Sequence, residues 1–281
     1  MPRSSRMQES SQITVIRPIK GWKKLNLVEL WEYRELLLAF CVRDIKIRYK
    51  QTVLGAAWAI LQPLVTMLIF SIIFGRLAGI PSDGFPYPVF VYSGLLPWML
   101  FSNAISSSSG SMVGSAHMVS KIYFPRVVIP FSAVGSGLVD FAVSACILLL
   151  LMFVYDVPWT WQLIVTPVLL TGVILVALGV GTALSALTVS YRDFRYVVPF
   201  MVQIWMYLTP VVYPLGFIPE KWRWLLYLNP LTGYIEGFRS VFLGKPFDFV
   251  GISSAVILTM FVFLGGLKYF RKVEQRFADV I

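Results

Sequence analysis

The chain has 281 residues, of which 57% are hydrophobic and only 14% are charged, and its mean hydropathy is +0.74. This composition excludes an ordinary soluble domain and indicates a protein whose main solvent is the lipid bilayer. The net charge of +10 does not indicate a nucleic-acid partner, because the cations cluster beside apolar segments and form no stripe on a polar domain.

Residues 1–26 are polar and show no sustained periodicity, which predicts a flexible cytoplasmic tail. The tail lacks a continuous apolar core followed by a small-residue cleavage site, so we expect no removed signal peptide.

Residues 27–53 predict an amphipathic helix that lies along the membrane interface. Its apolar face holds Leu27, Leu30, Trp31, Leu37, Leu38, Cys41 and Ile45. Arg34 and Arg48 intrude on this apolar face, which suits an interface where long cationic stems lie along hydrocarbon and their heads reach phosphates. The alternative is a helix packed on a soluble core.

Six apolar stretches of about 20 residues predict an all-α integral membrane protein whose transmembrane domain occupies 54–281. The six expected spans are 54–75, 87–110, 127–155, 163–190, 197–215 and 251–270. With the N-terminus inside, 19 of the 24 lysines and arginines lie on the inner side of the membrane. This asymmetry predicts that both termini are cytoplasmic.

The stretch of about 216–250 is aromatic but too interrupted to span the membrane. Pro219 starts one short helix, Asn229 stops it, and Gly244 ends a second. We expect a re-entrant hairpin in the outer leaflet, which is tolerated only where protein or water covers its broken backbone.

Aromatic residues make up 15% of the chain and allow two interpretations. They form either an interfacial belt or a track on which pyranose rings stack. The candidates for channel lining are Trp58, Tyr92, Trp98, Phe101, Trp205, Tyr207 and Tyr213. Candidates for an outer gate are Trp222, Trp224, Tyr227, Glu236 and Arg239, of which the last two are three apart and are expected to pair.

No catalytic or metal-binding motif is evident in the sequence. Neither Gly-Lys-Ser nor Gly-Lys-Thr occurs, so the chain has no phosphate-binding P-loop, and any ATP must be hydrolysed by another protein. The single histidine, His117, has no neighbours at metal-ligand spacing and receives no role. The serines at 106–109 lack a Gly-x-Ser-x-Gly elbow and favour close helix packing. Cys41 and Cys146 fall in segments of different character and are expected as free thiols.

Asp140 is the one acidic residue near the middle of an expected span. An intramembrane carboxylate is a candidate for a proton relay or a substrate contact. No second ionisable residue lies in the apolar centre of another span, so a buried structural hydrogen-bonding role is favoured. A proton-coupled carrier that uses Asp140 remains an alternative, and an integral membrane enzyme is a third.

Several motifs carry a specific resemblance to a known family. They are Arg43-Asp44-Ile45-Lys46-Ile47-Arg48-Tyr49-Lys50-Gln51-Thr52-Val53-Leu54-Gly55, then Trp58 and Leu61-Gln62-Pro63-Leu64, Ser93-Gly94-Leu95-Leu96-Pro97-Trp98, Tyr123-Phe124-Pro125-Arg126, Tyr191-Arg192-Asp193-Phe194 and Tyr227-Leu228-Asn229-Pro230-Leu231. In them the chain resembles the permease family of polysaccharide ATP-binding-cassette exporters. The likeness extends from about Glu29 to the C-terminus.

This resemblance implies a homodimer of six-span subunits in the bacterial inner membrane, bound to two copies of a separate ATPase that holds ATP and magnesium. The cargo it implies is undecaprenyl-diphosphate-linked polysaccharide, namely O-antigen or another surface glycan such as capsule or teichoic acid. No cofactor is expected in the chain itself.

The resemblance also implies roles for individual residues. A coupling segment at about 111–126 would contact the ATPase through Lys121, Ile122, Tyr123, Phe124, Pro125 and Arg126, assisted by Tyr191, Arg192 and Asp193. The substrate diphosphate or lipid headgroups would contact Arg43, Lys46, Arg48 and Lys50. A plain cytoplasmic loop and ordinary positive-inside anchoring are the respective alternatives.

Overall fold

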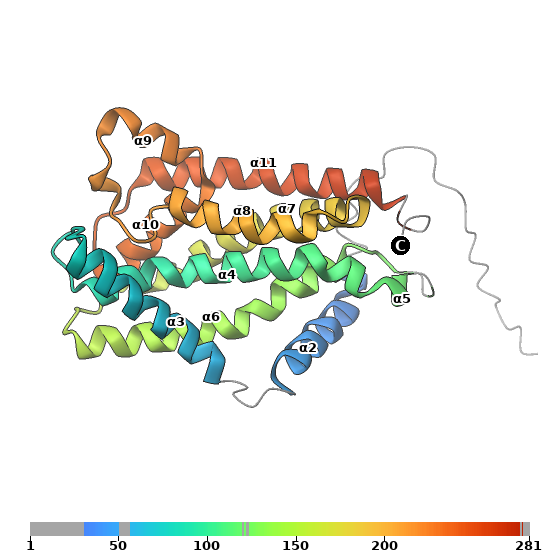
Figure 1. Cartoon of the computed structure of the whole chain (residues 1–281), viewed down its shortest axis with the longest axis horizontal. Helices are drawn as coiled ribbons and strands as arrows, with labels where there is room; N and C mark the ends of the chain where they lie inside the picture. Colours follow the sequence, from blue (N-terminus) through green and yellow to red (C-terminus); the bar gives the residue numbers. More distant parts are fainter. Residues whose placement is uncertain (1–30, 51–56, 120, 122–123, 276, 278–281) are drawn as a thin grey trace, which may run out of the picture.

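The computed structural model describes residues 31–50, 57–119, 121, 124–275 and 277. Across these residues every regular element is helical and none is a strand, which confirms the all-α prediction. Figure 1 shows the long helices lying roughly side by side in an elongated bundle. The expected tail, the ends of the expected interface helix, and Ile122 and Tyr123 of the expected coupling segment lie outside the described residues.

Five helical segments of the described chain are long and apolar enough to cross a membrane. They are α3 with its π-helical continuation η1 (Ala57–Phe70 and Ser71–Leu77), α4 (Tyr87–Gly114), α6 (Val128–Val154), η2 with α7 (Trp161–Val165 and Thr166–Ser190) and α11 (Phe249–Glu274). The ends of these segments lie within about four residues of the ends of five of the six expected spans. Residues 54–56, at the start of the first expected span, are not described.

The remaining expected span, 197–215, is helical only in its first part. Helix α8 runs from Phe194 to Leu208 and has 15 residues. At about 1.5 Å per residue it is roughly 22 Å long, which is less than the ~30 Å hydrocarbon core of a bilayer. Thr209 is extended because Pro210 follows it, and proline disfavours a helical residue immediately before it.

The interrupted stretch after α8 forms the two short helices that the sequence predicts. After the short turn η3 (Leu215–Phe217), α9 spans Glu220–Tyr227 and has no buried residue, whereas α10 spans Pro230–Leu243 and is buried at every position except Glu236. The Asn229 side chain caps α10, and Gly244 ends it with a φ of 69°. The two helices therefore differ: α10 belongs to the core, and α9 lies on its surface.

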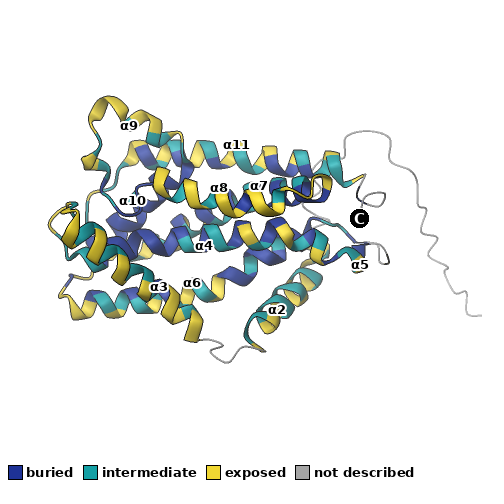
Figure 2. Cartoon of the chain, viewed as in Figure 1, coloured by how far each residue is buried: buried dark blue, intermediate teal, exposed yellow. Residues whose placement is uncertain are grey.

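The core is centred on α4, which packs against α6, α7 and α10 and is mostly buried, as Figure 2 shows. Helices α7 and α11 approach closely at Gly179 and Gly266, where a Cβ on Gly266 would lie 2.0 Å from the Gly179 carbonyl oxygen. Small residues allow such backbone contacts between membrane helices, where burial of apolar surface from water does not drive association.

Helix α2 (Arg34–Lys50) is the least embedded long helix of the described chain. It has no buried residue and packs mainly on α6 (Figure 1). At one end of the bundle, near the four-residue helix α5 (Ala116–Val119), α6 begins and α11 ends; α9 and α10 lie at the opposite end. We call these the α5 end and the α9 end.

Candidate functional site

Helix α2 is joined to the middle of α6 by a polar cluster around Asp140. Arg48 forms an ion pair with one carboxylate oxygen of Asp140, and the Tyr49 hydroxyl donates a hydrogen bond to the other. The second terminal nitrogen of Arg48 donates to Ser107 Oγ on α4 over 3.4 Å. Burial, followed by the hydrogen bond to Asp140, raises the pKa of Tyr49 to about 12, so the hydroxyl stays a donor at neutral pH. We call Arg48, Tyr49 and Asp140 the Asp140 cluster.

Small side chains also take part in the contact between α2 and α6. Cys41 Sγ lies 3.5 Å from the Ser132 carbonyl oxygen, and Ser132 Oγ donates to Asp44 over 3.3 Å. A Cβ on Gly135 would lie only 2.8 Å from Cys41 Sγ. The two helices are thus in direct contact, yet no large apolar side chain of α2 is buried between them.

The four cations that the resemblance assigns to anion binding differ in whether they have an ion-pair partner. Arg43 forms an ion pair with Asp44 at 2.8 Å, and Arg48 pairs with Asp140. Lys46 and Lys50 are exposed and have no ion pair among the described residues. In this conformation the two lysines are available to an external anion, whereas the two arginines are engaged.

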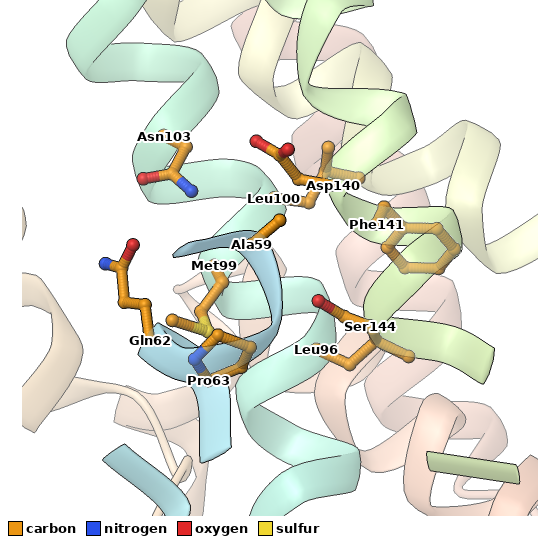
Figure 3. A pocket seen from close by; sticks show the side chains of 10 residues that line it. All are labelled: Ala59, Gln62, Pro63, Leu96, Met99, Leu100, Asn103, Asp140, Phe141 and Ser144. Atoms are coloured by element: carbon orange, nitrogen blue, oxygen red, sulfur yellow. The ribbon is translucent and has the colours of Figure 1, made fainter. Parts of the chain in front are cut away.

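A small pocket of about 30 Å³ lies beside Asp140, between α3, α4 and α6. Figure 3 shows Asp140 and Ser144 on α6, Asn103 on α4 and Gln62 on α3 around it. This volume is about what one water molecule needs, and the polar groups could provide its hydrogen bonds. The surroundings of Asp140 therefore combine an ion pair with further polar side chains at the middle of the bundle.

At the α5 end, the expected coupling residues are divided between core and surface. Phe124 is buried, with its ring 5.8 Å from that of Phe40, and Arg126 donates to the Glu274 carbonyl oxygen over 2.7 Å. Lys121 is exposed and Pro125 is half-buried. The burial of Phe124 indicates that this side chain helps to hold the fold and is not exposed to lipid.

The second group of expected coupling residues forms an exposed turn between α7 and α8. Tyr191, Arg192 and Asp193 are all exposed, and the Tyr191 ring is 6.3 Å from that of Phe194. These side chains are available for contact with another protein, and so is Lys121.

At the α9 end, the expected pair of Glu236 and Arg239 is confirmed, with 2.7 Å between the two charged groups. Arg239 is fully buried, however, and its guanidinium also donates to the carbonyl oxygens of Val211 and Tyr213. The arginine thereby satisfies carbonyls of the irregular segment after α8. The pair is a buried clamp, whereas the spacing in the sequence indicates only that the two residues can pair along a helix.

Asn229 is a second connection at the α9 end, and sequence reasoning identified it only as a helix stop. Its side-chain oxygen accepts hydrogen bonds from the Leu231 backbone and the Trp205 indole, both at 3.1 Å, and its amide donates to Thr209 over 2.8 Å. Asn229 thus joins the end of α8 to the start of α10. Tyr227 in turn donates to Asp248 over 2.7 Å, which ties α9 to the start of α11.

The candidate channel and gate aromatics occupy different environments. Tyr92, Trp98 and Phe101 are buried in the core of the subunit, so their burial gives no support to channel lining. Trp205 and Tyr213 are half-buried. The candidates that are exposed are Trp58, Tyr207, Trp222 and Trp224. Trp222 lines an apolar groove of about 640 Å³ between α8 and α9, together with Trp205 and Asn229.

Sequence reasoning missed the pairing of Asp140 with Arg48 and the contribution of Tyr49. The available signal was that a mid-span carboxylate and an arginine on the apolar face of a helix both need a partner. Cys41 and Cys146 are free thiols, as expected. Among the described residues no group of His, Cys, Asp and Glu is placed to hold a metal ion.

These features define a multi-pass integral membrane protein that holds ion pairs at Asp140 and at Glu236. Residues 35–243 match the family described as ABC-2 type transporter, and the chain belongs to this family. This confirms the resemblance inferred from the motifs.

Similar proteins include an O-antigen export permease and a polysialic acid transport protein. The chain is 30% identical to the O-antigen export system permease protein RfbA of Klebsiella pneumoniae over 262 residues, which cover 92% of this chain and 98% of the relative. It is 30% identical to the RfbA protein of Myxococcus xanthus, with 76% and 82% covered, and 26% identical to the polysialic acid transport protein KpsM of Escherichia coli, with 84% and 93% covered.

Proposed function

We propose that this chain is the permease half of an ATP-driven exporter that moves lipid-linked polysaccharide, specifically O-antigen, from the cytoplasmic side across the bacterial inner membrane. The observation that carries the proposal is the 30% identity to O-antigen export permeases over nearly the whole length of both chains. A lipid diphosphate carrier is the anionic part of this cargo, and the exposed Lys46 and Lys50 suit it.

In this proposal the transporter is a homodimer with two copies of a separate ATPase that binds ATP and magnesium. The α5 end of the bundle faces the cytoplasm, because the basic residues Lys121, Arg126, Arg271 and Lys272 gather there. Lys121, Tyr191, Arg192 and Asp193 are the exposed groups placed to contact the ATPase.

Cytoplasmic placement of both termini requires an even number of crossings, and we assign the additional crossing to α8 with the segment that follows it. Helix α8 packs beside α4 and α7 and leads from the α5 end towards α9 and α10 (Figure 1). The clamp of Arg239 on the carbonyls of Val211 and Tyr213 supports this assignment, because it satisfies irregular backbone at membrane depth. Helices α9 and α10 then form the outer, re-entrant element.

Two other functions can each be compared with the proposal on a specific observation. Export of capsule has support from the 26% identity to KpsM, and teichoic acid is a cargo of the same chemical class. A proton-coupled carrier would use Asp140, but Arg48 and Tyr49 occupy both of its carboxylate oxygens. A carboxylate held by a cation and a phenol is a poor proton relay.

The test is to express the tagged chain together with a candidate ATPase subunit of its own organism in a strain that lacks its own O-antigen permease. We expect the ATPase to copurify in stoichiometric amount and O-antigen to reach the cell surface, as detected by surface labelling and by gel analysis of lipopolysaccharide. Capsular polysaccharide at the surface in place of O-antigen would reassign the cargo. Export that continues without any ATPase but stops with an uncoupler would overturn the proposal in favour of the carrier.

A further inference from the structure

Asp140 and Arg48 lie where neither can exist as an isolated charge at low cost. Asp140 is near the middle of α6, an apolar helix of 27 residues, and Arg48 reaches it from α2. Charged side chains at this depth are expensive unless they are paired or reach water. The pair is nevertheless not sealed, because 34% of the Arg48 side chain and 21% of the Asp140 side chain are exposed. An external group can therefore reach the guanidinium.

Helix α2 is attached in a way that allows it to move. It has no buried residue, small side chains such as Cys41 take part in its contact with α6, and the Asp140 cluster provides an ion pair that holds it there. Segments with few buried apolar contacts open at low free-energy cost.

The ligand chemistry follows from the guanidinium. Arg48 contacts one carboxylate oxygen of Asp140 and Ser107 Oγ, and a phosphate group offers the same acceptor geometry with more negative charge. Lys46 and Lys50 are exposed on the same helix and would strengthen the attraction. After the exchange, Asp140 would keep its position beside the polar pocket with Asn103, and the separation of α2 would also release the hydrogen bond from Tyr49.

We propose that Asp140 is a resident counter-ion that holds Arg48 until a phosphate group of the transported lipid replaces it, and that this exchange separates α2, including Cys41, from α6. The inference rests on the proposed function in that the cargo carries a lipid diphosphate. To the phosphate contact already expected for Arg48 it adds a competing carboxylate and a movement of α2, and it assigns Asp140 a positioning role.

The structure offers a lock for this movement. A cysteine at Gly135 would place its Cβ 2.8 Å from Cys41 Sγ, close to the roughly 3 Å that separates Cβ and the opposite Sγ across a disulfide. In the complete transporter with Cys146→Ser, we expect Gly135→Cys to form a disulfide with Cys41 on oxidation. Glycan export should then fall at least tenfold and recover on reduction.

The control for the lock is Gly135→Ser, which adds a side chain of similar size that cannot be oxidised to a disulfide. It should export at the same rate with and without oxidant. Undiminished export by the oxidised Gly135→Cys transporter, with the disulfide verified by loss of maleimide labelling, would overturn the proposed movement. A transporter that does not export even with native Gly135 would refute the proposed function, whereas the labelling experiment below would still decide the exchange.

The exchange itself is measured by maleimide labelling of Cys41 in the Cys146→Ser transporter, with native Gly135, in lipid nanodiscs. Contact with α6 shields Cys41, and burial, followed by the charge of Asp44, raises its pKa, so labelling is slow while α2 is docked. We expect a polyprenyl diphosphate in phosphatidylcholine to accelerate labelling about fivefold, as expected for loss of a partly exposed ion pair. Phosphatidylglycerol is the arm that tests an ordinary phospholipid headgroup.

Two variants test whether the pair of Arg48 with Asp140 controls the labelling rate. Asp140→Asn keeps an acceptor for Tyr49 but removes the charge that holds Arg48, so labelling should be fast without any diphosphate. Arg48→Gln should also label quickly and should no longer respond to diphosphate. Acceleration by phosphatidylglycerol alone would identify a lipid headgroup as the phosphate source. No acceleration by either lipid, or an unchanged response in Arg48→Gln, would overturn the exchange.

Discussion

The guanidinium of Arg239 lies over the ring of Phe90, with 3.9 Å between its Cζ atom and the ring centroid. The same group donates to the backbone oxygens of Val211 and Tyr213 and pairs with Glu236. Replacement by methionine keeps most of the volume but leaves Glu236 and two carbonyls without their donor. We expect Arg239→Met to lower the free energy of unfolding by about 3–5 kcal/mol, measured by thermal unfolding in detergent.

The matched control is Arg223→Met on α9. Its ion pair with Glu220 spans 3.6 Å, and the Glu220 side chain is 88% exposed. Solvent screens such a pair, and Arg223 otherwise donates to one carbonyl oxygen, that of Ile218 over 3.1 Å, so the variant should change stability by less than about 2 kcal/mol. If both arginine variants unfold at the same temperature as the native chain, Arg239 is not the clamp that the structure indicates.

The contact of α7 with α11 gives a second prediction with a neighbouring control. A methyl group on Gly266 would collide with the carbonyl of Gly179, whereas a Cβ on Gly265 would meet no atom within 4 Å. Gly266→Ala should therefore force the helices apart and reduce the yield of folded monodisperse protein in size-exclusion chromatography. Gly265→Ala should be neutral or slightly stabilising, by up to ~1 kcal/mol of helix propensity. Equal behaviour of the two variants would contradict the close approach.

The sequence predicts a helix well where a long apolar run is enough to specify it. A stretch such as 127–155 has too few charges to be stable in water and is long enough to cross a bilayer, and the structure has a helix at Val128–Val154. Apolar character does not show where a helix ends inside a broken segment. The prediction of a span at 197–215 therefore did not take account of Pro210, and α8 ends at Leu208.

The candidate site was less predictable, because its contacts are between elements far apart in the sequence. Arg48 and Asp140 are separated by 92 positions, and nothing in the local pattern pairs them. Aromatic residues posed a related problem. Core and lipid surroundings are both apolar, so the pattern could not show that Tyr92 is buried and Trp58 exposed.

The hydrogen bond of Tyr227 to Asp248 predicts a specific pH dependence. Burial, followed by this hydrogen bond, raises the pKa of Tyr227 from 10.0 to about 12. Folding thus favours the protonated phenol, and the stability that it contributes is complete below pH 10 and is lost between about pH 10 and 12. The native chain should unfold at a higher temperature than Tyr227→Phe below pH 10, and the difference should shrink above it. A difference that grows with pH would show that the phenol is not held as a donor.

The expected coupling residues separate into those that hold the fold and those free to contact a partner. Phe124 is buried against Phe40, so Phe124→Ala should destabilise the permease itself, by about 3–5 kcal/mol. Its effect on ATP hydrolysis would then say little about coupling. Lys121, Tyr191 and Arg192 are exposed, and their replacement should leave the unfolding temperature unchanged.

We therefore expect Tyr191→Ala combined with Arg192→Ala to uncouple the proposed ATPase without unfolding the permease. ATP hydrolysis by the purified complex should lose its stimulation by the permease, or the ATPase should no longer copurify, because the exposed turn between α7 and α8 is the contact removed. The control is Arg76→Ala, an exposed arginine on η1 at the opposite end of the bundle, which should retain both the partner and its hydrolysis. Loss of the partner with Arg76→Ala and retention with the double variant would place the ATPase at the α9 end and reverse the orientation of the chain.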